Sequence, residues 1–273
     1  MNAPAHAASV ETAVRGDLAA AFQWAARLGF HEAVANHFSA AVSANGDRFL
    51  LNPRGRHFSQ MRASDLLLLD ASDAAGSGAG SGAGSGAGVG AGDRVVDGGP
   101  NRHPDADPTA WYLHAHLHRH VPQARVILHT HMRYATTLAC LQDFEFLMLD
   151  QNACRFHGRI AYDRGYAGMA LDDAEGERVA RLLGTNKNVL FLGNHGVIVV
   201  GETVAEAFDE LYYLEKAAEL QVLALSTGRE LSLIPDDVAA VACEQWRTYP
   251  EVAELHFAAL RAMLADEGST YAR

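Results

Sequence analysis

Three histidines have the residue type and spacing of a metal chelate. His129 and His131 end the apolar run at residues 126–128. Because strand side chains two residues apart share a face, these two point the same way. His195 lies in a Gly-Asn-His-Gly turn between two apolar runs, which predicts a β-hairpin with the histidine at its tip. Three neutral nitrogens would leave a position of a divalent metal free for water or substrate, as catalytic sites require.

An ordinary structural role is the alternative for these residues. Histidines are common at strand edges, so an H-x-H pair alone is weak support for a metal. The third histidine, on a turn flanked by Gly193, Asn194 and Gly196, is what favours the chelate. The chain has 14 histidines, so most of them must do something other than bind metal.

Size and composition favour one large domain. The chain has 273 residues, of which 49% are apolar, enough for a sizeable core. We expect a disordered N-terminus at residues 1–9 and a single domain over residues 10–273. The sequence has no 18-residue apolar run and no signal-peptide pattern, which predicts a cytoplasmic protein without a membrane partner.

Charge and cysteine content argue against nucleic-acid binding and against disulfide or thiolate zinc sites. The net charge is −11 and the basic residues are scattered, which argues against a nucleic-acid partner. Cys140, Cys154 and Cys243 have no C-x-x-C spacing, so we expect buried free thiols rather than disulfides or a thiolate zinc site.

The first hundred residues predict a helix, a hairpin and a flexible insertion. Residues 10–28 carry an apolar stripe that Gly29 ends, and residues 36–42 and 49–51 read as strands joined by an Asn-Gly-Asp turn. Residues 73–99 consist largely of Ser-Gly-Ala-Gly repeats, which predicts a flexible surface insertion rather than a phosphate-binding loop.

The middle of the chain begins with a capped helix. Asp107 as N-cap and Pro108 as first residue predict a helix that ends before Pro122. Its four histidines form two pairs spaced four apart, but they lack the glutamate of an H-E-x-x-H site, so we expect structural roles. After the strand of the H-x-H pair we expect a helix at 134–141, a strand at 144–149, a loop-rich stretch at 151–166 and a helix at 172–184.

The C-terminal third predicts helices. Thr203 and Glu206 form a capping box for a long helix that reaches residue 227, and two more helices follow at about 236–246 and 251–265. Helices at both ends with hairpin-like strands between them predict a three-layer α/β/α sandwich around a mostly antiparallel sheet.

Five sequence features together resemble the class II aldolase/adducin family, which includes sugar-phosphate aldolases and pentulose-phosphate epimerases. They run in the family's order over about residues 10–230: N-H-F-S at 36–39, N-P-R-G at 52–55, the H-T-H pair, G-N-H-G around His195, and the long helix after it. The resemblance implies that His129, His131 and His195 bind a divalent metal. Zinc is the first expectation, with iron or manganese as alternatives. It also implies a homotetramer with active sites between subunits.

One part of the family's pattern is missing. Family aldolases carry two serines and a catalytic glutamate at the start of the helix before the H-x-H pair. The matching positions here read Pro108, Thr109 and Ala110. The resemblance therefore predicts a variant without the usual proton-transferring glutamate, for which an ordinary retro-aldol reaction on a sugar phosphate is in doubt.

A carbon–carbon lyase remains compatible with such a site. Decarboxylation leaves a metal-stabilised enolate without needing a glutamate to remove a hydroxyl proton. The substrate would be a small carboxylated or carbonyl compound. The candidates for binding it are Asn36, Arg54, Gly55 and Thr109: Arg54 could clamp a carboxylate or lie free on the surface, and the helix start at Thr109 could hold an anion. The candidate proton donors are Tyr162, Tyr166 and His157.

Two other functions stay open at this point. Three neutral nitrogens also suit Fe(II), so the pocket could be that of a non-haem iron oxygenase acting on an aryl 2-keto or hydroxy acid. The chain could also be a non-catalytic, adducin-like interaction module. Oxygen consumption separates the first two, and retention of three ligand-type histidines counts against the third.

Overall fold

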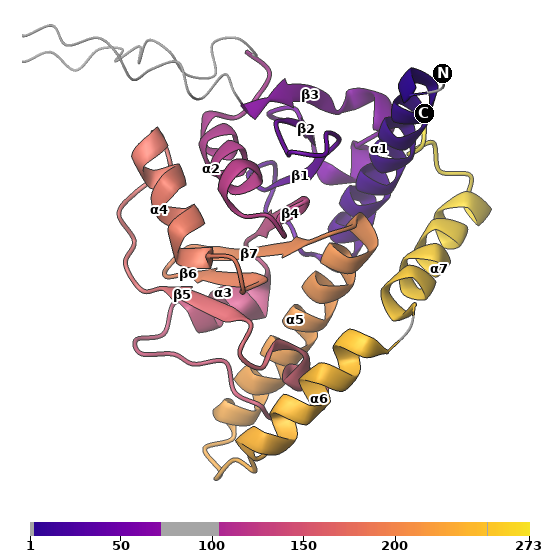
Figure 1. The fold of residues 1–273 in the computed structure, drawn as a ribbon. Coiled ribbons are helices and arrows are strands. Elements are labelled where there is room, and N and C mark those ends of the chain that lie inside the picture. The colour runs from indigo at the N-terminus through magenta and orange to yellow at the C-terminus, as the bar shows by residue number, and fades with distance from the viewer. Residues whose placement is uncertain (1–2, 72–103, 250) are drawn as a thin grey trace, which may run out of the picture.

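Seven strands form one sheet within the described residues, which are 3–71, 104–249 and 251–273 (Figure 1). In this computed structural model the strand order is β3-β2-β1-β4-β7-β6-β5. Only β5 and β6 pair in parallel, and the other neighbours are antiparallel, as expected. The bounds are β1 His37–Ala41, β2 Arg48–Leu51, β3 Leu67–Asp70, β4 Val126–Thr130, β5 Ile160–Asp163, β6 Val189–Leu192 and β7 Gly196–Gly201.

Helices cover both faces of this sheet, which confirms the three-layer α/β/α sandwich. Phe38, Leu128 and Val199 face the core shared with α1, α3, α5 and α7, whereas Ile127 and Ile198 face the core shared with α2 and α4. The helices are α1 Ala3–Leu28, α2 Pro108–His120, α3 Arg133–Ala139, α4 Asp173–Leu183, α5 Val204–Ser226, α6 Asp236–Thr248 and α7 Val252–Asp266. Short 3-10 turns are η1 Phe58–Gln60, η2 Ala63–Asp65 and η5 Ala153–Phe156.

The first helix is longer than expected. It begins at Ala3 rather than at residue 10, so residues 3–9 are helical and not disordered. Alanine has the highest helix propensity, and Pro4 is tolerated because it stands in the first turn. The helix ends at Leu28 as predicted, where Gly29 takes a left-handed φ of 70°.

The predicted strand at residues 144–149 is wrong. Phe144 and Phe146 are buried and Glu145 is exposed, so the alternation was real. The backbone donors, however, go to side chains: the N–H of Phe146 donates to Tyr162 Oη, and that of Leu147 donates to Gln221 Oε1. A segment whose donors are satisfied in this way has no need of a strand partner.

The structure also contains a strand that the sequence did not reveal. Within the stretch expected to be loop-rich, β5 pairs in parallel with β6 at the edge of the sheet. All four of its residues are partly exposed. An edge strand this short carries no clear period-2 signal.

The predicted turns and caps are present. The β1–β2 hairpin turns at Gly46, where a Cβ would lie 2.5 Å from the His118 carbonyl oxygen, so glycine lets the turn pack against α2. The β6–β7 hairpin turns through Asn194 at a φ of 56°. Asp107 caps α2, and Thr203 caps α5.

Three further expectations have mixed outcomes. Cys154 and Cys243 are buried free thiols as predicted, but Cys140 is exposed. The predicted insertion at 73–99 lies outside the described residues. In the described part of the chain, no helix is both long and apolar enough to cross a membrane.

Candidate metal centre

The three predicted ligands lie together at one end of the sheet. His129 is in β4 and His131 directly follows it, while the hairpin carrying His195 is held beside them because β7 pairs with β4. Their ring centroids are separated by 5.0, 4.8 and 4.9 Å. One nitrogen of each ring lies within 4.8 Å of the others.

The donor set fits a tetrahedral metal. Two nitrogens bound to such a centre at 2.0–2.1 Å lie about 3.3 Å apart, and the Nε2 atoms of His129 and His131 are 3.2 Å apart. His129 Nδ1 donates to the Val197 carbonyl at 3.0 Å, and His131 Nδ1 donates to Glu32 at 2.7 Å. Both Nε2 atoms are therefore left with a lone pair facing the cluster.

Burial favours the neutral form of two of the three histidines, His129 and His195. It is the main cause that lowers the pKa of His129 well below its usual value and the pKa of His195 to about 4, with the neighbouring histidines adding to both shifts. Neutral imidazole is the form that binds metal. His129 and His195 can therefore each offer a lone pair to a cation near neutral pH without first losing a proton.

Gly196 sets how closely the hairpin approaches β4. A Cβ at this position would lie 2.5 Å from the Thr130 carbonyl oxygen and 2.8 Å from Cδ2 of His131. The glycine after His195 is therefore required for the two histidine-bearing segments to meet.

Of the three candidate proton donors, Tyr166 is the one beside the cluster. Its ring centroid is 6.2 Å from that of His195, and the residue is 56% exposed. Both residues line a small cavity with Glu175 and Arg178. Hydrogen bonds to Glu175 and Asp163 raise the pKa of Arg178, so its charge is already engaged.

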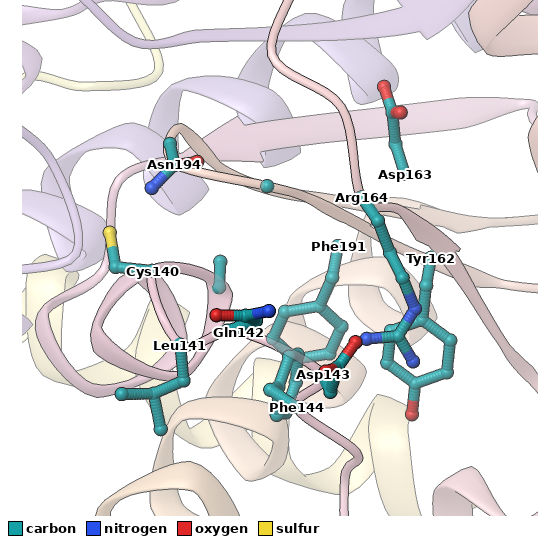
Figure 2. Close-up of a pocket in the computed structure, with 12 residues that line it drawn as sticks. Cys140, Leu141, Gln142, Asp143, Phe144, Tyr162, Asp163, Arg164, Phe191 and Asn194 are labelled. Atoms are coloured by element: carbon teal, nitrogen blue, oxygen red, sulfur yellow. The ribbon is translucent and has the colours of Figure 1, made fainter.

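Tyr162 and His157 are placed elsewhere. Figure 2 shows Tyr162 and Asp163 pointing in opposite directions from β5, and Tyr162 packs on Phe144 and Phe191 in the core of the α1/α5 face. It lines a separate cavity of about 300 Å³. His157 bonds to Asp236 at 2.8 Å beside α6. Within one subunit neither joins the three histidines.

The substrate-binding candidates form two groups. Asn36 is buried near the cluster: its Oδ1 accepts the backbone N–H of Glu32 at 2.7 Å, and its Nδ2 is sealed from solvent without a partner. Arg54 and Thr109 meet at the start of α2, where the exposed Arg54 guanidinium lies 3.9 Å from Asp107. Gly55, beside Arg54, has a φ of 76°.

One expectation about this helix start needs correction. The N–H groups of Thr109 and Ala110 are not free for an anion, because both donate to the Asp107 carboxylate, as does the Thr109 hydroxyl. Ala110, where family aldolases have the glutamate, is 1% exposed and packs among apolar side chains.

Sequence reasoning missed Glu32 and His37. Glu32 follows the first helix and reaches His131 only through the tertiary fold. His37 stands in the N-H-F-S motif and lies directly opposite His129 in the β1–β4 register. Knowledge of that strand pairing would have identified it.

The profile of the Class II Aldolase and Adducin N-terminal domain matches residues 16–222. The chain belongs to the class II aldolase and adducin family. A crystal structure of an aldolase II superfamily protein from Pseudomonas syringae is 31% identical, with a TM-score of 0.78 over 97% of this chain and 96% of that one.

Two curated relatives in this family span most of the chain. A protein of Pseudomonas aeruginosa named as a class 2 aldolase is 30% identical over 86% of this chain and 81% of its own length. The decarboxylase NovR of Streptomyces niveus is 28% identical over 89% of this chain and 82% of its own length. The class II aldolase resemblance predicted from the motifs is confirmed.

Proposed function

We propose that this protein is a metal-dependent carbon–carbon lyase acting on a small carboxylated or carbonyl substrate. The observation that carries the proposal is the convergence of His129, His131 and His195, each with a ring nitrogen available to one common centre. A purely structural use would not require three imidazoles with ring nitrogens this close together.

Zinc is the metal we expect, with iron or manganese as alternatives, since three imidazoles suit all of them. When bound, the metal supplies a Lewis acid that stabilises negative charge on a substrate oxygen. His129 and His131 would hold it through Nε2, because their Nδ1 atoms are engaged by Val197 and Glu32.

Decarboxylation is the reaction we favour within this class. The position of the usual glutamate is Ala110, which is enclosed by apolar side chains and offers no base. Loss of CO₂ needs no base: the electrons of the broken C–C bond stay on the substrate carbon, and the enolate later takes up one proton. The similarity to the decarboxylase NovR supports this choice.

Tyr166 is our candidate for returning that proton. It is the predicted donor that lies beside His195, and its exposed side chain is free to contact a substrate bound at the cluster. Arg54 offers a guanidinium for a substrate carboxylate, since among the described residues its one ionic partner, Asp107, is 3.9 Å away. Asn36 Nδ2 is buried without a partner, so it would reach a substrate only after a local movement of the segment before β1.

We also propose that the protein is a homotetramer. The loop beside the cluster exposes Tyr166, Met169 and Leu171 by 56, 67 and 50%. A neighbouring subunit that covers this apolar loop would also enclose the site. Light scattering coupled to size-exclusion chromatography tests this, and a monomer at micromolar concentration would contradict it.

Metal analysis and turnover test the lyase proposal together. Plasma mass spectrometry should find about one equivalent of metal in the wild type and far less in His195→Ala. The matched control, His157→Ala, should keep its metal, because His157 is bonded to Asp236 outside the cluster. Equal metal in all three proteins would refute the ligand set.

The reaction itself is tested with a panel of 3-keto acids and hydroxybenzoates, with CO₂ release as the readout. Turnover that persists without oxygen supports the lyase. Turnover only with iron and O₂ would identify an oxygenase instead. No turnover of any panel member with metal fully bound would favour an adducin-like, non-catalytic role.

A further inference from the structure

A chain of hydrogen bonds runs between α2 and the sheet and ends beside the metal centre. It joins the Ala124 carbonyl, His118, Ser39, His114 and His37, in that order. All four side chains are at most 5% exposed. The sequence suggested structural roles for His114 and His118 but did not suggest this connection.

The direction of the chain is fixed at its far end. A carbonyl oxygen only accepts hydrogen bonds, so the 2.8 Å contact between Ala124 and His118 places a proton on His118 Nδ1. In the neutral ring the other nitrogen, Nε2, then carries a lone pair. The Ser39 hydroxyl, 2.7 Å away, must donate to it.

The same reasoning determines the next two links. Because the Ser39 proton is committed to His118, the Ser39 oxygen accepts from His114 Nδ1. His114 Nε2 is then an acceptor, and His37 Nδ1 donates to it at 2.7 Å. His37 is left with an unprotonated Nε2.

His37 lies at the edge of the histidine cluster but outside it. It faces His129 across the β1–β4 pair, with ring centroids 4.7 Å apart. The group of nitrogens close enough to share one metal comprises His129, His131 and His195, without His37. His37 Nε2 has no hydrogen-bond partner among the described residues, and it is not one of their sealed, unpaired polar atoms.

We propose that His37 Nε2 is a fixed hydrogen-bond acceptor for the ligand at the metal centre. A ligand would satisfy it with an O–H next to the oxygen that chelates the metal, which points to 2-hydroxy carbonyl compounds, among them 2-hydroxy-3-keto acids, whose loss of CO₂ leaves an enolate. His114, Ser39 and His118 are positioning residues that hold the tautomer of His37. This substrate class rests on the metal-dependent function proposed above.

The tautomers are measurable without any metal. In metal-free protein labelled with ¹⁵N-histidine, long-range ¹H–¹⁵N correlation spectra at neutral pH should show His37, His114 and His118 all protonated at Nδ1 and unprotonated at Nε2. A proton on Nε2 of His37 would overturn the proposal. In Ser39→Ala, where the link between His114 and His118 is cut, the His37 signal should change to a mixture of tautomers. A chain that serves only packing would leave it unchanged.

Ligand choice is measured on the cobalt-loaded protein, whose visible spectrum reports binding without turnover. The wild type should bind glycolate roughly three- to tenfold more tightly than methoxyacetate, the range expected for one hydrogen bond. His37→Phe should lose this preference and still bind cobalt. The matched control, His120→Phe, changes an exposed histidine on α2 and should keep it.

The two proposals fail in different ways. Equal binding of glycolate and methoxyacetate by cobalt-loaded wild type overturns the role of His37 and leaves the metal-dependent function standing. Failure of the wild type to bind cobalt or zinc overturns the metal-dependent function, and with it the ligand preference. If His37→Phe does not fold, Ser39→Ala takes its place and should show a weaker preference for glycolate than the wild type.

Discussion

His131 Nδ1 donates a hydrogen bond of 2.7 Å to the Glu32 carboxylate, although the two residues are 99 positions apart in the chain. A carboxylate in this position fixes the tautomer and orientation of a histidine and raises the basicity of its other nitrogen. Glu32 is therefore the residue that aims His131 at the proposed metal.

Replacement of Glu32 should weaken metal binding without emptying the site. We expect Glu32→Gln to raise the dissociation constant for zinc about 10- to 100-fold, the usual effect of losing such a partner. Competition titration against a chelator dye measures it. Glu230→Gln, an exposed glutamate on the loop after α5, is the control and should bind zinc as the wild type does. Equal affinity in both variants would remove Glu32 from the site.

Substitution of Tyr166 should affect turnover, whereas substitution of Tyr162 should affect the free energy of unfolding. Tyr166→Phe should lower turnover about 10²- to 10⁴-fold with metal content unchanged, as expected for loss of a general acid. Tyr162→Phe should keep turnover but lower the free energy of unfolding by about 1 kcal/mol, because the N–H of Phe146 loses its acceptor. Steady-state kinetics and urea unfolding provide the two readouts, and the reverse pattern would exchange the roles.

His118 should make the protein less stable in mild acid. Burial lowers the pKa of His118 from 6.5 to about 3 in the folded protein. The unfolded chain therefore binds a proton below pH 6.5 that the folded chain refuses, and stability falls as the pH falls. At pH 5 this residue alone should cost about 2 kcal/mol relative to neutral pH.

The test for His118 compares slopes rather than absolute stabilities. The free energy of unfolding in urea, measured from pH 7 to 5, should fall less steeply in His118→Gln than in the wild type. Identical slopes would show that His118 is protonated in the folded protein.

Among the ion-paired residues outside the metal centre, we expect substitution of Arg155 to lower the free energy of unfolding most. Arg155 is 6% exposed, pairs with the buried Asp209, and stacks between the rings of Tyr213 and Trp246 at 4.3 and 4.8 Å. Arg155→Met would remove the arginine partner of the buried Asp209 carboxylate and leave it only the bond to His256, and loss of one partner of a buried ion pair costs about 3–5 kcal/mol.

The control for Arg155 is an exposed pair of the same type. Arg247→Met removes a bond to Glu244 whose partners are 62 and 63% exposed, and such pairs contribute about 1 kcal/mol or less. Thermal or urea unfolding of both variants measures the difference. Equal losses of unfolding free energy in the two variants would mean that burial does not increase the contribution of the Arg155 ion pair to stability.

The sequence by itself determined the features that depend on local chemistry. Hydrophobic periodicity, the Asp107 and Thr203 caps and the glycine turns were enough for most elements and for the layered fold. The three ligand-type histidines were recognisable because a strand pair and a turn residue carry their own geometry.

Only the tertiary structure decided what depends on long-range contacts. The alternating pattern at residues 144–149 could not show that Tyr162 and Gln221 take its backbone donors. No spacing rule brings Glu32 to His131, and the role of His37 follows from its register opposite His129. These relationships arise because pairing and packing join residues far apart in the chain, and a linear pattern does not record which partners meet.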